Sequence, residues 1–486
     1  MSTKYDAIII GSGQGGTPLA GAFAKAGHRT ALIERTHIGG CCVNEGCTPT
    51  KTMVASGRAA YLARRGGDYG VHTSQGEANE VSVDMIKVRQ RKRDIVTSFR
   101  GGNESRTQSA GVEVLMGEAA FSGSRTLRVE MNDGSVKEIE GNKIFINVGE
   151  RPAPPKLEGL GSLDPSRVLD STSIQELDVV PTHLVVIGGG YVGVEFAQLF
   201  RRLGSEVTIV QRGKQLLGRE DTEVADCLTD ILREDGLTVM LESEALNTLS
   251  TSSGSFDLAV QTKDKVEILH GTHILFAAGR IPNSDSLNLE AAGIKTNKKG
   301  YIETNEYLET SAEGVWALGD VKGPPAFTHI SYDDFRIIQK NIISSPSATA
   351  RLSTKNRLVP YVVYTDPQLG HIGLHEHEAR ALYPDNPKRI KVAKMPVSYV
   401  ARALETDESR GMMKAVVDEE TGLILGFTCL GLEGGEVMAV VQMAIMGNVG
   451  WENMRDAVWA HPSLAESLNN IWGSWNEIGH IYLFAE

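Results

Sequence analysis

The chain has 486 residues, of which 41% are hydrophobic and 23% charged, and its formal net charge is −12. At roughly 150 residues per domain, this length predicts about three domains. The acidic balance disfavours nucleic acid as the main partner, because a polyanion is bound by a basic surface. No apolar run approaches the ~18 residues of a membrane span, the start does not read as a signal peptide, and five cysteines are too few for a disulfide-stapled scaffold. We therefore expect a cytoplasmic enzyme.

The chain opens with a strand, a glycine-rich turn, a helix and a second strand. These parts are a strand over residues 5–10, the glycines Gly11, Gly13 and Gly16, a helix over 17–26, and a strand over 30–33 that leads into Glu34. In a dinucleotide-binding turn, such glycines allow a tight bend, a close approach to pyrophosphate and close helix packing. The helix start donates N–H groups to phosphate. Glu34 stands where a carboxylate accepts from a ribose 2′-hydroxyl, which suits FAD or NAD.

The same order recurs in the middle of the chain. Its parts are a strand over 183–187, the glycines Gly188, Gly190 and Gly193, a helix over 194–203, and a strand over 206–210 that leads into Gln211. In both copies the residue after the second strand lies 23 positions beyond the first glycine. One such turn is a weak signal, but two at equal spacing predict two Rossmann-like dinucleotide-binding domains.

The second copy differs at the position that selects the cofactor. Gln211 replaces the acid, and Arg212 and Lys214 follow it. Loss of the carboxylate removes repulsion toward a 2′-phosphate, and two cations would attract it. The pattern favours NADPH over NADH, although cations on an exposed loop would look the same.

The last part of the chain, from about residue 352, has no nucleotide turn. Strands are predicted over 358–365, 390–397, 412–417 and 426–430, and helices over 437–446 and 463–471. This predicts a separate α+β domain. Met438, Met443 and Met446 are expected in its core or in a subunit interface.

Two cysteines follow shortly after Glu34. Cys42 and Cys47 lie in the segment Gly39-Gly-Cys-Cys-Val-Asn-Glu-Gly-Cys-Thr-Pro-Thr-Lys51. Two thiols this close indicate either a redox pair or a metal site. A structural zinc site commonly uses two such pairs, whereas Cys227 and Cys429 stand alone in apparent core segments. A redox dithiol beside a bound nucleotide is the better interpretation.

This segment resembles the active-site motif of the FAD-dependent pyridine nucleotide–disulfide oxidoreductases. The resemblance covers nearly the whole chain, and the further matching segments are 274–283, 315–320, 360–368 and 461–466. It implies an FAD domain in two parts (1–152 and 283–351), an NAD(P) domain (153–282) and a dimerisation domain (352–486), hence a homodimer.

The resemblance also implies roles for particular residues. Cys47 would be the flavin-proximal thiol and Cys42 the interchange thiol that meets the acceptor. His461, from the other subunit, would be the acid–base group, and Glu466 would orient it. Lys51 and Glu195 would form an ion pair where hydride arrives. Gly149 and Asp320 would contact FAD, with Asp320 holding its ribityl chain, and Gly279 would contact NAD(P).

Two interpretations stay open beside these roles. The spacing Ser463-x-x-Glu466 also suits a capping box at a helix start. Cys41 departs from the threonine usual in the family; it is either a small packed residue or a third soft metal ligand beside Cys42 and Cys47. Apart from that possibility, we expect no metal site.

The motifs 218–221, 327–336 and 461–469 resemble the mercuric-reductase-like branch of the family. The tail, 478–486, has no cysteine, which argues against mercury delivery in the usual way and against a thioredoxin reductase relay. The expected activity passes electrons from NAD(P)H through FAD and the dithiol to a disulfide or a soft metal ion. The alternatives are an oxidase or diaphorase acting on oxygen or quinones, and a redox or metal sensor.

Overall fold

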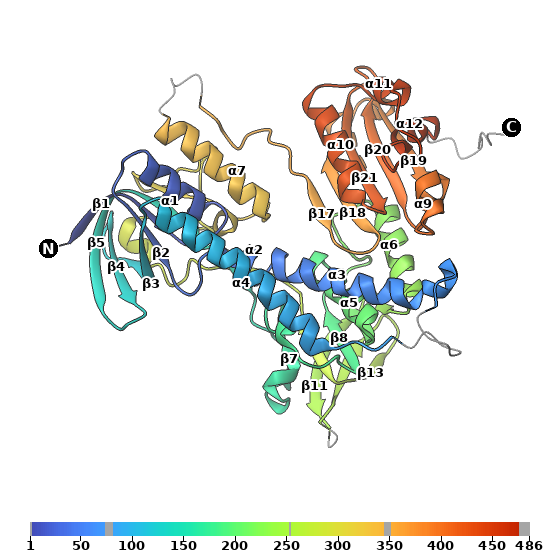
Figure 1. Cartoon of the computed structure of the whole chain (residues 1–486), viewed down its shortest axis with the longest axis horizontal. Coiled ribbons are helices and arrows are strands. Elements are labelled where there is room, and N and C mark those ends of the chain that lie inside the picture. Colours follow the sequence, from blue (N-terminus) through green and yellow to red (C-terminus); the bar gives the residue numbers. More distant parts are fainter. Residues whose placement is uncertain (1, 73–80, 252–253, 345–350, 476–486) are drawn as a thin grey trace.

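A computed structural model describes residues 2–72, 81–251, 254–344 and 351–475 (Figure 1). Three sheets organise it, and helices α2 (Gly40–Asn44), α3 (Cys47–Arg64) and α4 (Met85–Ser109) lie among them. In Figure 1 the first sheet is on the left, the second at the bottom and the third at the upper right. None of the helices in the described part of the chain is long and apolar enough to cross a bilayer.

The first sheet carries the first glycine turn. Its strands are β1 (Thr3–Ile10), β2 (Thr30–Glu34), β3 (Glu113–Phe121), β4 (Thr126–Met131), β5 (Val136–Ile146) and β16 (Val315–Ala317). Strand β1 pairs in parallel with both β2 and β5, and after 168 intervening residues the chain returns to add β16 beside β5. Helices α1 (Gly16–Lys25) and α7 (Thr328–Ile338) pack together on this sheet through the cluster around Phe23 and Phe335.

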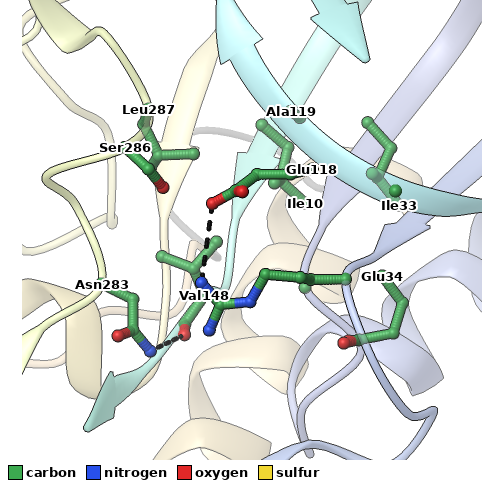
Figure 2. A pocket seen from close by; sticks show the side chains of 12 residues that line it. Ile10, Ile33, Glu34, Glu118, Ala119, Val148, Asn283, Ser286 and Leu287 are labelled. Atoms are coloured by element: carbon green, nitrogen blue, oxygen red, sulfur yellow. Dashed lines mark hydrogen bonds and ion pairs between the residues drawn. The ribbon is translucent and has the colours of Figure 1, made fainter. Parts of the chain in front are cut away.

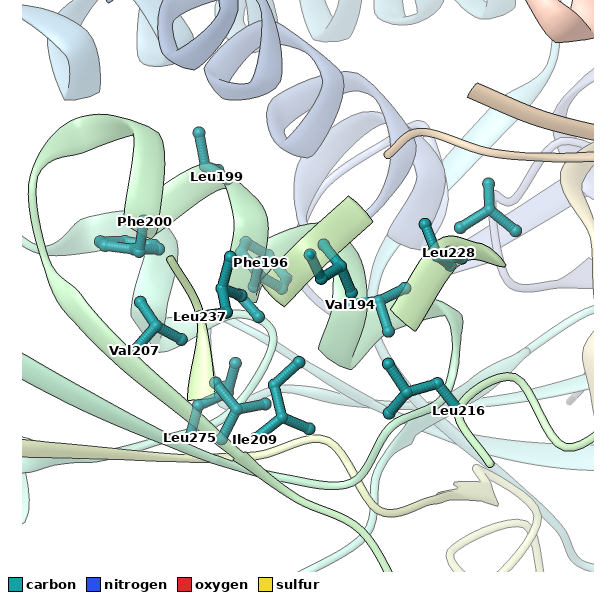
Figure 3. Packing of buried hydrophobic residues seen from close by; sticks show 14 of the residues in the cluster. Val194, Phe196, Leu199, Phe200, Val207, Ile209, Leu216, Leu228, Leu237 and Leu275 are labelled. Atoms are coloured by element: carbon teal, nitrogen blue, oxygen red, sulfur yellow. The ribbon is translucent and has the colours of Figure 1, made fainter. Parts of the chain in front are cut away.

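The second sheet carries the second glycine turn and is wholly parallel. Its order is β10 (Thr238–Met240), β9 (Glu206–Val210), β8 (His183–Ile187), β14 (His273–Phe276) and β7 (Val168–Leu169). Helices α5 (Tyr191–Leu203) and α6 (Thr222–Glu234) bury their apolar sides in its core, where Val194, Phe196 and Leu228 meet Ile209 (Figure 3). A meander of β11 (Glu244–Ser250), β12 (Phe256–Gln261) and β13 (Val266–Gly271) is attached, and β6 (Glu150–Pro152) pairs with β15 (Arg280–Pro282).

The third sheet is antiparallel and forms the expected α+β domain. Its order is β17 (Tyr361–Val363), β18 (Gln368–Gly373), β21 (Ile424–Gly431), β20 (Met412–Asp418) and β19 (Ile390–Pro396). Its helices are α8 (Glu376–Leu382), α9 (Ala401–Glu405), α10 (Gly434–Met446), α11 (Trp451–Asp456) and α12 (Ser467–Asn470). On α10, Met438 is buried, whereas Met443 and Met446 are 64% and 59% exposed.

The sequence-based expectation for this domain missed helices α8, α9 and α11, and it also differed from the structure at β18 and α12. Strand β18 was not predicted, because glycines and a histidine give it little β-propensity. Gly370 is nevertheless required there, since a Cβ would lie 2.6 Å from the carbonyl oxygen of Gly434 on α10. The helix predicted over 463–471 is much shorter, because its first residues form a turn and α12 begins only at Ser467.

Candidate active site

Cys42 and Cys47 lie on two consecutive helices beside the first glycine turn. Cys42 is on α2, and Cys47 is the first residue of α3. Gly40, with φ of +67°, brings α2 so close to the turn that a Cβ would lie 2.5 Å from the Cα of Gly13. A helix N-terminus stabilises a thiolate, so the start of α3 is a favourable place for a charged sulfur.

The two thiols form a hydrogen bond in which Cys42 is the donor. This bond lowers the pKa of Cys47 below its ordinary value and raises that of Cys42; burial opposes the effect on Cys47. Two further groups favour the Cys47 thiolate: the Thr328 hydroxyl, 3.2 Å from its Sγ, and the charge of Lys51. In the reduced pair the negative charge therefore rests on Cys47.

The structure brings Lys51 and Glu195 together from two domains. Nζ of Lys51 lies 2.6 Å from Oε2 of Glu195, and the other carboxylate oxygen accepts from the backbone N–H of Tyr364 at 2.8 Å. Burial alone would lower the pKa of Lys51, but the Glu195 charge and hydrogen bond raise it above its ordinary value. The pair therefore places a fixed cation beside Cys47.

Cys42 lines a cavity. The cavity lies between α2, α3 and α4, and its lining includes Gln14, Cys42, Thr48, Phe99 and Arg106. Cys47 is not part of the lining. Phe99 is 51% exposed and lies beside the basic Arg106, so an acceptor reaching Cys42 would meet one apolar and one cationic group.

Cys41 points elsewhere. Its Sγ lies 3.8 Å from a guanidinium nitrogen of Arg280, and burial raises its pKa to about 11. Arg280 in turn bonds Glu150, with 2.7 Å between Nε and Oε1. Among the described residues, the sulfurs of Cys41, Cys42 and Cys47 do not come within 4.8 Å of one another as one set of donors. The structure therefore does not assemble the three-thiol metal site.

The first glycine turn has the shape that a dinucleotide requires. A Cβ at Gly11 would lie 2.4 Å from the carbonyl oxygen of Asn147, and one at Gly16 would lie 2.1 Å from that of Gly11. A Cβ at Gly13 would lie 2.9 Å from Oδ1 of Asn147. The same oxygen accepts a hydrogen bond from the Gly16 N–H. Because these positions carry no side chains, the backbone N–H groups at the start of α1 are left accessible to phosphates.

A pocket adjoins this turn at the end of the first sheet (Figure 2). Glu34 lies at its edge, and Asn283 closes another side by donating to the Val148 carbonyl at 2.8 Å. The carboxylate of Glu34 accepts from the backbone and hydroxyl of Ser12 at 3.1 and 2.6 Å. The pocket has both apolar and polar walls, and Glu34 is placed where it could accept from a ribose hydroxyl, so the residues present suit the adenosine part of FAD.

Asp320 and Gly149 lie toward the dithiol end of the same domain. Gly149 has φ of +66°, and Asp320 begins the short turn after β16. Burial and the nearby charge of Glu150 raise the pKa of Asp320 to about 6, whereas Arg280 opposes this. A half-buried carboxyl at this position could accept from a ribityl hydroxyl of bound FAD.

The second glycine turn repeats these contacts with one change. A Cβ at Gly193 would lie 2.0 Å from the carbonyl oxygen of Gly188, while Gly190 is the extended residue that precedes α5. Gln211 accepts from the Gly189 N–H at 3.0 Å, as Glu34 does from Ser12. The turn is therefore held by an uncharged side chain.

Three more of the expected NAD(P) residues surround this turn. Arg212 is exposed and lies 3.7 Å from Glu244, and Lys214 is also exposed. Gly279 follows β14 and has open space where a Cβ would be.

His461 and Glu466 form a pair in the third domain. Nδ1 of His461 lies 2.9 Å from both carboxylate oxygens of Glu466. The Ser463 hydroxyl accepts from the Glu466 N–H at 3.2 Å, so half of a capping box is present as well. The side chain of His461 is 66% exposed, and among the described residues it makes no hydrogen bond to the dithiol of its own chain. Its imidazole is free to face another subunit.

Sequence reasoning did not single out Thr328 or Asn147. Thr328 is 281 residues from Cys47, and only the folding of α7 onto the first domain brings them together. Asn147 serves both the first glycine turn and the Leu318 carbonyl, to which it donates at 2.8 Å. Its position directly after a buried strand was the only local signal.

Comparison with known proteins identifies the class. Residues 5–335 match the pyridine nucleotide-disulphide oxidoreductase family, and residues 359–471 match the dimerisation domain of that family. The chain therefore belongs to the pyridine nucleotide-disulphide oxidoreductases. It is a flavoprotein oxidoreductase that uses FAD, and its dimerisation domain indicates a homodimer.

Individual relatives narrow the branch as the sequence predicted. The chain is 36% identical to the probable pyridine nucleotide-disulfide oxidoreductase RclA of Escherichia coli, covering 96% of this chain and 99% of that one. It is 32% identical to the mercuric reductase of Staphylococcus aureus, covering 96% and 81%. A solved structure of E. coli RclA in complex with Cu(II), described as an HOCl-induced flavoprotein disulfide reductase, matches with a TM-score of 0.85 and 34% identity, over 97% and 99% of the chains.

Proposed function

We propose that this enzyme takes electrons from NADPH and delivers them through FAD and the Cys42–Cys47 dithiol to a disulfide or a soft metal ion, in the cytoplasm. The observation that carries the proposal is the division of the dithiol. Cys42 lines an open cavity, whereas Cys47 lies beside Lys51 and Thr328. One thiol is thus placed for the acceptor and the other for the electron supply.

When bound, FAD would supply two-electron transfer from NADPH to the Cys42–Cys47 disulfide, which would thereby become the dithiol. The residues of the chain then perform thiol–disulfide exchange. The Cys42 sulfur, as thiolate, attacks one sulfur of the acceptor disulfide; a mixed disulfide forms and one thiolate leaves. The Cys47 thiolate attacks Cys42, the second acceptor sulfur leaves, and the Cys42–Cys47 disulfide closes. Each leaving thiolate takes up one proton.

His461 is suited to supply and remove those protons. The two carboxylate oxygens of Glu466 hold its Nδ1, so Nε2 is the exposed nitrogen. Because His461 has no bond to the thiols of its own chain in the described structure, we assign it to the dithiol of the partner subunit. A base is needed there because the pKa of Cys42 is raised.

For a metal acceptor, the same two sulfurs would be the ligands, because thiolates select soft ions. The Cu(II) complex of the related RclA supports this class of acceptor. The tail over 478–486 has no cysteine and lies outside the described residues. Cys41 is the other cysteine of this segment, and its sulfur lies beside Arg280.

The test is anaerobic reduction with NADPH, followed by addition of disulfides, Hg(II), Cu(II) or quinones. We expect reoxidation by at least one disulfide or metal ion. Cys42→Ser should reduce this turnover to background while the flavin stays bound. Cys227→Ser is the matched control, because this thiol lies far along the chain on α6, and it should retain turnover. Full turnover in Cys42→Ser would contradict the proposal.

A diaphorase would give a different pattern. Quinone or oxygen reduction would persist in the Cys42→Ser/Cys47→Ser variant, and no disulfide or metal ion would reoxidise the reduced enzyme. That result would mean that electrons reach the acceptor without passing through the dithiol.

A further inference from the structure

A second cluster of ligand-type side chains lies away from the dithiol, where the second and third domains meet. Glu220 precedes α6, His371 is on β18, and His375 precedes α8. All three are buried, at 4%, 2% and 7% exposure. One donor atom from each residue lies within 4.8 Å of the other two. Among the described residues, no other group of three such side chains meets this condition.

The carboxylate of Glu220 is buried without a cation. Its Oε1 accepts from the hydroxyls of Tyr361 and Tyr191 at 2.6 and 3.2 Å, but its Oε2 has no hydrogen-bond partner. A charged carboxylate in such a place is costly unless a cation compensates it. Consistently, burial raises the pKa of Glu220 to about 7.

The nearby lysine is already engaged by other acids. Nζ of Lys414 lies 2.7 to 2.8 Å from carboxylates of Asp221, Glu223 and Glu376. Glu223 and Glu376 also pair with Lys394 and Arg380, so these acids are balanced by cations of their own. Within the described part of the chain Glu220 has no such pair, and its buried carboxylate is the one that a bound cation would compensate.

The histidines offer neutral imidazoles. Burial lowers the pKa of His371 to about 3 and also lowers that of His375. Nδ1 of His375 is buried without a hydrogen-bond partner, whereas His371 contacts the Thr428 hydroxyl through Nδ1, at 2.8 Å, and the Gly373 carbonyl through Nε2, at 3.2 Å. A histidine ligand commonly donates its second N–H to such a carbonyl.

We propose that Glu220, His371 and His375 bind one divalent transition-metal ion, of which Zn²⁺ is the expected example, and that this ion ties the NAD(P) domain to the dimerisation domain. Two imidazoles and one carboxylate are a common ligand set for zinc, with water as the fourth ligand. The site is separate from the dithiol, and the proposal does not depend on the proposed redox function.

Binding requires one ring to turn. The imidazoles of His371 and His375 are stacked, with centroids 4.0 Å apart and 16° between their planes. An ion lies in the plane of each ring that binds it, so two stacked rings cannot both bind it without rotation. His375 is the ring that turns, because His371 is held at both of its nitrogens, by Thr428 and Gly373. The turn breaks the contact by which the His375 side chain caps α8 and its stacking on His377, and His371 exchanges the Thr428 hydroxyl at its Nδ1 for the ion.

The test uses the flavin-bound full chain with Cys42→Ser/Cys47→Ser, since the dithiol would itself bind zinc. After removal of metal with a chelator, calorimetric titration should show one Zn²⁺ per chain, and X-ray absorption should show nitrogen and oxygen ligands without sulfur. Adding His375→Gln or Glu220→Gln should weaken binding by a factor on the order of 100 or more, since even changes behind the ligands cost 10- to 100-fold. Zn²⁺ should raise the unfolding temperature of the parent but of neither variant.

His377→Gln is the matched control, because His377 is exposed and close to the cluster without belonging to it. It should bind Zn²⁺ like the parent. Glu220→Gln keeps an acceptor for both tyrosine hydroxyls and removes only the buried charge, so it should fold even if His375→Gln does not. Absence of stoichiometric binding in the parent, or equal binding in Glu220→Gln, would overturn the proposal. Equal loss in His377→Gln would overturn the assignment of the ligands.

Discussion

At the scale of single residues, a few neighbouring groups make the pKa values of the two thiols differ. Cys47 receives hydrogen bonds from Cys42 and Thr328 and lies near Lys51, whereas Cys42 donates. The thiolate is therefore formed on the sulfur that faces away from the acceptor cavity. The second sulfur needs an external base before it can attack.

Thr328→Val should make this thiolate harder to form. A hydrogen bond to a charged group contributes about 1.5 to 3 kcal/mol, which corresponds to about 1 to 2 pH units. The hydrogen bond from Thr328 lowers the pKa of Cys47, so Cys47 forms its thiolate at a lower pH than it otherwise would. Loss of the hydroxyl should therefore raise the pH at which the thiolate forms by that amount. The measurement is the pH dependence of Cys47 alkylation in Cys42→Ser. Thr328→Ser keeps the donor, so its midpoint should not move; an unmoved midpoint in Thr328→Val would contradict the role.

At the scale of elements, the two glycine turns are built alike. In each, a side chain at the end of the second strand accepts from the backbone N–H after the first glycine, at 3.1 Å for Glu34 and 3.0 Å for Gln211. An amide oxygen and a carboxylate oxygen serve this contact equally well. The residue is therefore free to differ in charge without loss of the turn.

Gln211→Glu should change the cofactor preference. The new carboxylate keeps the bond from Gly189 but repels a 2′-phosphate and accepts from a 2′-hydroxyl instead. We expect the ratio of kcat/KM for NADPH over NADH to fall about 10-fold, which corresponds to about 1.4 kcal/mol. Gln261→Glu adds the same charge on β12, outside the turn, and should leave the ratio as it is. An unchanged ratio in Gln211→Glu would mean that position 211 does not select the cofactor.

Much of this could be predicted from the sequence because the signals are local. The glycine turns and the dithiol segment each fit within a few dozen residues, and Gly40, two residues before Cys42, packs against Gly13 of the first turn. Strand β18 was missed because its pairing with β17 and β21, not its own propensity, makes it a strand. Thr328 and the Glu220 cluster were missed because their partners lie 281 and about 150 positions away. Such contacts come from the packing of domains, which a periodicity in the sequence does not reveal.

At the scale of the whole molecule, the third domain presents the features of a subunit interface. Met443 and Met446 expose apolar surface on α10, and His461 is paired only with Glu466 in the described part of its own chain. In a dimer, the partner subunit would cover these methionines and would bring a thiol within reach of His461. The site would then be completed by two chains.

Mixed dimers test this arrangement. Cys42→Ser and His461→Gln homodimers should both lose nearly all disulfide turnover. A heterodimer with one variant in each chain contains one intact site, made of Cys42 from one chain and His461 from the other, and should recover about half of the activity per dimer. The measurement is the turnover of doubly tagged, purified heterodimers. If each site used its own histidine, the heterodimer would be as inactive as the homodimers.

Glu195 has a consequence for the mechanics of the molecule. One carboxylate joins Lys51 on a helix of the first domain, its own helix α5 in the second and the backbone of Tyr364 at the start of the third. Arg202 and Gln198, on the same helix, reach Asp366 in the third domain. A domain that swings away must break buried bonds at this joint. These contacts therefore oppose movement of the three domains relative to one another at this joint.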